Sequence, residues 1–195
     1  MKVVLIGDSI RMGYQPLVVA KSPAIDVWGP VQNCRHSVWA HDRFLEWVTE
    51  QEPDVVHVNF GIHDAVLLPD GEHQILLPQY RLCLRRFIDK VASLGKTQMI
   101  WATTTPMYSP DSEKPMAQWP INEKIEIDEY NAAALEIVHS KGVPVNDLHD
   151  VIVRNDFSKC LSEDGCHMTD FGNEVLSDAV IAAIGAHAPD AGDGK

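Results

Sequence analysis

VVLIGDSIRMG, residues 3–13, places an apolar run directly before a Gly-Asp-Ser sequence. Residues 3–6 are a short, continuous apolar segment of the kind that forms a fully buried strand in a parallel sheet. Residues from about 12 to 21 then repeat apolar side chains at a helical period. The stretch therefore predicts a strand, a tight turn and a helix, with the hydroxyl of Ser9 at the carboxyl end of the strand.

The rest of the chain repeats this alternation of short apolar runs and longer stretches with helical spacing. Further strands are predicted over residues 25–28, 55–60, 99–102 and 143–146. Further helices are predicted over residues 37–48, 78–92, 127–140, 149–155 and 169–184. Because repeated strand–helix units fold into a parallel sheet with helices on both faces, the sequence predicts a three-layer α/β/α sandwich of about five strands. One domain over residues 1–187 and a polar tail at 188–195 are expected.

The chain has 195 residues and is strongly acidic, with 28 acidic against 16 basic residues and a formal net charge of -12. Such a surface repels phosphate backbones and anionic lipid, so neither a nucleic acid nor a membrane is expected as a partner. No apolar run approaches the roughly 20 residues that span a bilayer. The N-terminal sequence lacks the long apolar region of a signal peptide, so we expect a cytoplasmic protein.

Neither a metal nor a cofactor is expected. The cysteines form no CxxC pair, which makes a zinc or redox motif improbable and predicts free thiols in a reducing compartment; they are Cys34, Cys83, Cys160 and Cys166. The histidines match no metal-ligand spacing. The first turn lacks a GxGxxG or P-loop pattern, so a flavodoxin-like nucleotide or flavin binder has little support.

Three side chains from opposite ends of the chain suggest nucleophilic catalysis. Parallel strands end at one edge of a sheet, where ligands of this class of fold bind. Ser9 follows the first strand, and a serine hydroxyl needs an adjacent base. His167 could take its proton, and Asp164, three residues earlier, could orient the imidazole if the chain turns between them. Each residue alone would also suit an ordinary turn or helix start, but together they predict a Ser-His-Asp triad.

An acyl-transfer site also needs hydrogen-bond donors for the oxyanion of its tetrahedral intermediate. The backbone N–H of Ser9 is one candidate, and an N–H in the loop of residues 33–37 is a second. His63, in the sequence Gly61-Ile62-His63-Asp64 after the third strand, is a candidate side-chain donor. Contacts with substrate are expected from Asp8, Asn33 and Trp119.

At these residues the sequence resembles the SGNH hydrolase superfamily, also called GDSL esterases and lipases, along essentially the whole chain. Gly7-Asp8-Ser9-Ile10 matches the first family block, with Ser9 at the nucleophile. Asp164-Gly165-Cys166-His167 matches the last block, DxxH, which carries the acid and the base. The resemblance implies a flavodoxin-like fold with five parallel strands. It also implies hydrolysis of esters, which include acetyl groups on carbohydrates, acyl thioesters and lipids.

Two positions depart from the family pattern. Arg35 stands where the second block has a glycine whose N–H serves the oxyanion hole, and a non-glycine N–H can still donate. His63 stands where the third block, GxND, has an asparagine. A neutral histidine can donate one hydrogen bond, and a protonated one would donate more strongly, which predicts activity that is sensitive to pH near 6–7.

The leading hypothesis is a serine esterase that hydrolyses small acyl esters, acetyl esters of carbohydrates in particular, through an acyl-enzyme. Its partner would be a small-molecule ester. The alternative is a binding protein on the same fold that has little or no catalytic activity, which Arg35 and His63 motivate. A separation above about 4 Å between the Ser9 hydroxyl and the nearer imidazole nitrogen of His167 would favour this alternative, because a catalytic pair needs hydrogen-bond reach.

Overall fold

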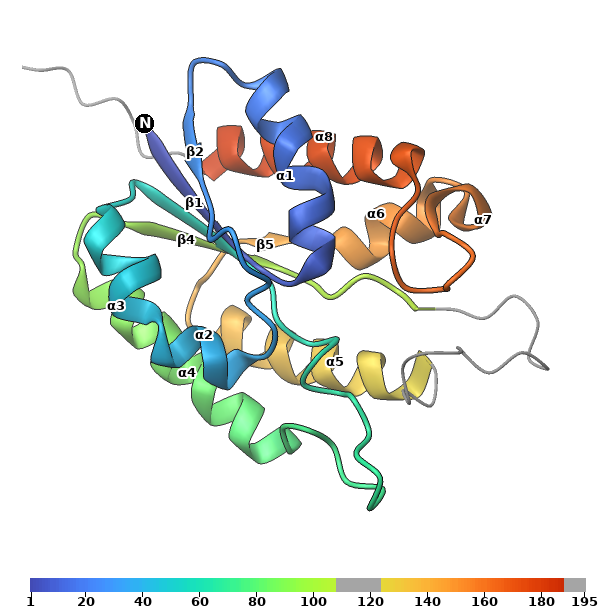
Figure 1. Ribbon diagram of the computed structural model, residues 1–195. Helices are drawn as coiled ribbons and strands as arrows, with labels where there is room; N and C mark the ends of the chain where they lie inside the picture. Colours follow the sequence, from blue (N-terminus) through green and yellow to red (C-terminus); the bar gives the residue numbers. More distant parts are fainter. Residues whose placement is uncertain (108–123, 188–195) are drawn as a thin grey trace, which may run out of the picture.

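The sheet of the computed structural model has five strands, all parallel, in the order β2-β1-β3-β4-β5. The structure describes residues 1–107 and 124–187. The strands are β1 (Lys2–Ile6), β2 (Asp26–Trp28), β3 (Val55–Val58), β4 (Gln98–Ala102) and β5 (Val145–Asn146). Helices cover both faces of this sheet, which confirms the predicted three-layer α/β/α class (Figure 1).

Two helices from opposite ends of the chain, α1 (Ser9–Lys21) and α8 (Asp170–His187), lie side by side on one face (Figure 1). The other face carries α2 (Ser37–Asp42), α3 (Phe44–Trp47), α4 (Leu77–Ser93) and α5 (Lys124–Ser140). A 3-10 turn, η1 (Thr49–Gln51), precedes β3. Two short helices, α6 (Leu148–Arg154) and α7 (Phe157–Cys160), pack against α8.

Some boundaries differ from the sequence prediction for local reasons. The first helix begins at Ser9 and not near residue 12, because the Asp8 carboxylate accepts the Ile10 N–H and caps the helix directly after the strand. The predicted helix over residues 37–48 is divided at Arg43 into α2 and α3. The four-residue helix α7 was not predicted, because it is too short to show a periodic pattern.

The two chain segments that follow β1 and β3 leave the sheet side by side. All four residues of the apolar run 3–6 are fully buried, as the unbroken pattern predicts. In the register of the sheet, Ile6 of β1 lies beside Val58 of β3. The segments that begin at Gly7 and Asn59 therefore leave the sheet together, which places Ser9 and His63 on neighbouring connections.

In residues 1–107 and 124–187, no helix is both long enough and apolar enough to cross a membrane. The same residues contain no group of three or more His, Cys, Asp or Glu side chains arranged to hold a metal ion.

Candidate active site

The hydroxyl of Ser9 lies at the first residue of α1, 2.8 Å from Nε2 of His167. Nδ1 of the same imidazole lies 2.6 Å from a carboxylate oxygen of Asp164. An ionised carboxylate only accepts hydrogen bonds, so Nδ1 carries the proton and Nε2 accepts from the serine hydroxyl. The three predicted residues thus form a continuous hydrogen-bonded chain between segments 158 residues apart.

The turn before α8 holds the Asp164 carboxylate in place. Its Oδ1 accepts the N–H groups of Cys166 and His167, at 2.9 and 2.8 Å, and the Ser162 hydroxyl at 2.7 Å. Gly165 takes a positive φ of 71°, which a glycine adopts without a Cβ penalty. Partial burial acts to raise the Asp164 pKa, but the hydrogen bonds from His167, Cys166 and Ser162 together hold it well below its ordinary value. Asp164 is therefore ionised when it faces the imidazole.

The loop after β2 forms a tight turn beside the serine. Arg35 has a φ of 54°, a left-handed conformation that residues other than glycine seldom adopt, at the position where the sequence comparison expects a glycine. Its N–H donates to Oδ1 of Asn33 at 2.7 Å. No described residue accepts a hydrogen bond from the N–H of Ser9. The Ser9 N–H is therefore available at rest, whereas the Arg35 N–H already has an acceptor.

The contact between Asn33 and His63 indicates that Nε2 of His63 carries no proton. Because the Arg35 N–H can only donate, Oδ1 of Asn33 faces Arg35, and Nδ2 faces Nε2 of His63 at 3.4 Å. An amide nitrogen is a donor only, so Nε2 of His63 accepts in this arrangement. His63 thus holds the amide group of Asn33 in the structure at rest.

The expectation that His63 titrates near pH 6–7 does not agree with its surroundings. Burial, then the positive charge of Arg35 and the repulsion between His63 and His167 when both carry a proton, lowers the pKa of His63 to about 4. The imidazole is therefore neutral over the pH range in which esterases are commonly assayed. Its charge state does not supply the pH dependence that the sequence suggested.

The other predicted substrate contacts fare differently. Asp8 is only 1 % exposed, and its Oδ1 caps α1 through the Ile10 N–H. Burial raises the pKa of Asp8 to about 6. A buried carboxyl group at this position stabilises the turn between β1 and α1. The prediction that Asp8 contacts substrate is therefore not supported. Asn33 is half-buried at the loop just described, and Trp119 lies outside the described residues.

Sequence reasoning missed Arg11, which is 3 % exposed and hydrogen-bonded to the loop before Asn33. A signal was present in the pattern. Arg11 shares the helical face of Tyr14 and Val18, at spacings of three and seven residues, and both of these side chains are buried. A charged residue in a buried stripe indicates a specific set of partners.

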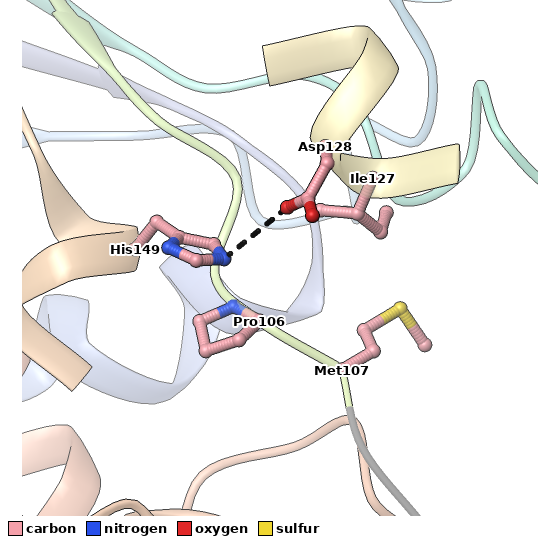
Figure 2. A pocket seen from close by; sticks show the side chains of 5 residues that line it. All are labelled: Pro106, Met107, Ile127, Asp128 and His149. Carbon is pink, nitrogen blue, oxygen red and sulfur yellow. Dashed lines mark ion pairs between the residues drawn. The ribbon is translucent and has the colours of Figure 1, made fainter. Parts of the chain in front are cut away.

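A small pocket lies beyond the carboxyl end of β4, which is two strands away from β1 in the sheet. Figure 2 shows its lining side chains, which come from the segment after β4 and from α5 and α6: Pro106, Met107, Ile127, Asp128 and His149. Nε2 of His149 lies 3.8 Å from a carboxylate oxygen of Asp128. Met107 is buried there, and the serine, histidine and aspartate above do not line this pocket.

Comparisons with known proteins find one family and several similar structures. Residues 5–175 match the model of the GDSL-like Lipase/Acylhydrolase family. A lipase/acylhydrolase from Enterococcus faecalis has a similar structure, with a TM-score of 0.79 and 25% identity over 97% of this chain and 98% of that one. No curated protein sequence matches the chain.

Two acetylxylan esterases share the fold at lower identity. The acetyl xylan esterase AlAXEase has a TM-score of 0.79 and 18% identity, over 94% of this chain and 100% of that one. An acetylxylan esterase from Geobacillus stearothermophilus has a TM-score of 0.73 and 21% identity, over 94% of each chain.

Proposed function

Because this chain belongs to the GDSL-like lipase/acylhydrolase family and is a serine ester hydrolase, we propose that it removes small acyl groups, acetyl in particular, from carbohydrate esters. We assign Ser9 as nucleophile, His167 as general acid and base, and Asp164 as the residue that orients the imidazole. The observation that carries this assignment is the hydrogen-bonded chain of 2.8 and 2.6 Å that joins them. The acetylxylan esterases of the same fold provide a precedent for the substrate class.

In acylation, the Ser9 oxygen attacks the ester carbonyl carbon while Nε2 of His167 takes the hydroxyl proton. The carbonyl oxygen becomes an oxyanion, and the ionised Asp164 stabilises the imidazolium. His167 then gives its proton to the leaving alcohol as the carbon–oxygen bond breaks, which leaves an acyl-Ser9 intermediate. In deacylation, a water molecule repeats these steps, the free acid leaves, and Ser9 regains its proton from His167.

The oxyanion is held by the Ser9 N–H and by the turn of residues 33–35. The Arg35 N–H can donate to the oxyanion if it releases Oδ1 of Asn33 and takes the substrate oxygen as its acceptor. The two N–H bonds of Asn33 Nδ2 point in different directions, and His63 occupies only one of them. We therefore place His63 in the oxyanion hole as the residue that fixes Asn33, and Asn33 as the side-chain donor.

The alternative of a binding protein with little or no activity is not favoured. The separation of 2.8 Å between the Ser9 hydroxyl and the imidazole is well below the value of about 4 Å that would have supported it.

The proposal is tested by turnover of p-nitrophenyl acetate, butyrate and octanoate, by labelling with a fluorophosphonate, and by release of acetate from acetylated xylo-oligosaccharides. We expect turnover that falls with acyl length and one label per chain. Ser9→Ala should abolish both. Ser158→Ala, a change at an exposed hydroxyl of α7 that bonds to Asp156, is the matched control and should retain both. Folded wild-type protein that neither turns over these esters nor takes the label would contradict the proposal.

A further inference from the structure

Arg11 is a buried cation, and among the side chains that the structure describes no carboxylate lies at ion-pair distance from it. Its guanidinium group donates instead to uncharged acceptors. Nη1 bonds to the Pro30 carbonyl at 2.9 Å and to the Gln15 side chain at 2.8 Å. Nη2 bonds to the Gln32 carbonyl at 2.9 Å. The buried charge is stabilised by these hydrogen bonds and by a longer-range interaction with the Asp8 carboxyl, so the side chain and the two loop segments hold one another in place.

Arg11 also contacts the segment that carries the nucleophile, besides a longer contact of 3.7 Å from Nη2 to Sγ of Cys34 on the loop. Nε and Nη2 both lie 3.3 Å from the carbonyl oxygen of Gly7, two residues before Ser9. The same carbonyl accepts the N–H of Cys34 at 3.2 Å. Arg11 therefore links the Gly7 carbonyl, at the end of β1, to the carbonyls of Pro30 and Gln32 in the loop before Asn33. The Cys34 N–H links the same Gly7 carbonyl to the loop just after Asn33.

Gly7 shows how closely the two parts approach. A Cβ at this position would lie 2.7 Å from Cβ of Arg11, which is shorter than real Cβ contacts allow. The φ of Gly7 does not lie in the left-handed region. The glycine before Asp8 thus makes room for Arg11 and is not needed for its backbone conformation.

We propose that Arg11 is a positioning residue that sets the oxyanion-binding turn of residues 33–35 against Ser9. This inference rests on the proposed function, because it explains how the two sides of the oxyanion hole keep their spacing. Gln32 and Cys34, which Arg11 and Gly7 hold, flank Asn33 on both sides along the chain. A planar guanidinium with donors in a fixed fork reaches three carbonyls at once, which a lysine ammonium on a flexible stem does not reproduce.

Displacement of the turn should affect the transition state more than substrate binding. Oxyanion donors bind most strongly to charge that develops after attack, so their position determines kcat. A misplacement of about 1 Å can lower the rate by about 100-fold. We therefore expect Arg11→Lys and Arg11→Ala to lower kcat for p-nitrophenyl acetate by about 10- to 100-fold, with KM changed by less than about threefold.

The experiment compares wild type, Arg11→Lys and Arg11→Ala with Arg81→Ala. Arg81 pairs with Glu136 on the outer face of α4 and controls for the loss of any arginine. Folding is checked by circular dichroism and by urea titration. The Arg11→Ala protein is also assayed with added methylguanidinium, at concentrations below those that unfold it. Recovery of kcat by at least threefold in Arg11→Ala, with no recovery in Arg81→Ala, is the expected result.

The outcomes separate the two proposals. Wild type without turnover or fluorophosphonate labelling would overturn the proposed function and, with it, this inference. Active wild type together with folded Arg11 variants of wild-type kcat would overturn the inference alone. A rise in KM at unchanged kcat, or failure of both variants to fold, would also overturn it, because Arg11 would then act on binding or on stability only. If only Arg11→Ala fails to fold, the kcat of Arg11→Lys decides.

Discussion

Ser37 and Asp64 are joined by three hydrogen bonds that connect the two loops around the site. The Ser37 N–H donates to both carboxylate oxygens, at 3.1 and 3.2 Å, and its hydroxyl donates to Oδ1 at 2.5 Å. Asp64 is fully buried. The last residue of the Gly61-Ile62-His63-Asp64 sequence thus fixes the start of α2, which directly follows the turn of residues 33–35. Arg11 thus fixes the first part of the loop between β2 and α2, and Asp64 fixes its end.

Replacement of Asp64 by asparagine should change how stability depends on pH. Burial, opposed by the hydrogen bonds from Ser37, raises the pKa of Asp64 to about 7. A carboxyl with a raised folded-state pKa takes up a proton on folding, so its favourable contribution is complete below its unfolded pKa and is lost as the pH rises through 7. Oδ1 of the variant's amide can still accept the two bonds that now reach Oδ1, from the N–H and the hydroxyl of Ser37, and the amide does not ionise. Between pH 5 and 8, Asp64→Asn should gain on the order of 2 kcal/mol of unfolding free energy relative to wild type.

Urea titrations of both proteins at pH 5 and pH 8 measure this difference. Asp89→Asn is the control, because this exposed carboxylate pairs with Lys141 on the surface. Its difference from wild type should be nearly the same at the two pH values. A pH-independent difference for Asp64→Asn would show that the buried carboxyl does not titrate in this range.

Replacement of Asp164 by asparagine should remove activity without unfolding the protein. Oδ1 of the amide can still accept the N–H groups of Cys166 and His167, so the turn persists. Nδ2 would face Nδ1 of His167 as a donor and favour the tautomer that cannot accept the Ser9 proton. The same change in serine proteases lowers kcat by about 10⁴-fold, and we expect a loss of about 10²- to 10⁴-fold here.

Steady-state assays with p-nitrophenyl acetate test this prediction. Asp156→Asn is the matched control: Asp156 lies in the same part of the chain, has a φ of 56° and pairs with exposed Lys159. Asparagine tolerates that conformation, so the control should keep wild-type kcat. An Asp164→Asn variant within about threefold of wild type would remove Asp164 from the mechanism.

Local patterns sufficed to predict some parts of this molecule. The apolar run before Ser9 and the spacing of Asp164 and His167 are readable because strand burial and a three-residue turn depend on adjacent residues. Ser9 follows a strand end, whereas Asp164 and His167 lie in the turn before α8, and the packing of α8 beside α1 brings them to Ser9. Their catalytic role stays a prediction, which the variants above address.

Other features depend on contacts between distant segments and could not be read from the sequence. The neutral state of His63 results from burial and from its position beside Arg35 and His167, which no local pattern reveals. The bonds of Ser37 to Asp64 join residues 27 positions apart. Arg11 was recognisable only as a charged residue in a buried stripe. Its partners on the loop after β2 could be identified only from the folded structure.

Gly61 should be the least replaceable glycine of the site. Its φ is 153°, and an added Cβ would lie 2.0 Å from Oγ1 of Thr104, a buried hydroxyl that bonds to the Phe60 carbonyl. Strain and overpacking together predict that Gly61→Ala costs about 3 kcal/mol of unfolding free energy. Gly95→Ala, with a φ of 77° and open space around the Cβ, bears the backbone strain alone and should cost about 1 kcal/mol. Equal losses in urea titration would mean that Thr104 moves aside freely.

Two substitutions of His63 separate its possible contributions to the oxyanion hole. If His63 acts by accepting from Nδ2 of Asn33, His63→Ala frees this amide and should lower kcat by about 10- to 100-fold. His63→Asn supplies a carbonyl oxygen that can accept from Asn33, and an amide that can donate directly to the oxyanion. It should therefore stay within about tenfold of wild type. Because the pKa of His63 is about 4, the ratio of wild-type to His63→Asn kcat should be constant between pH 6 and 8. A ratio that rises as the pH falls from 7 to 6 would instead indicate that a protonated His63 donates to the transition state, and the assignment of Asn33 as the side-chain donor would be wrong.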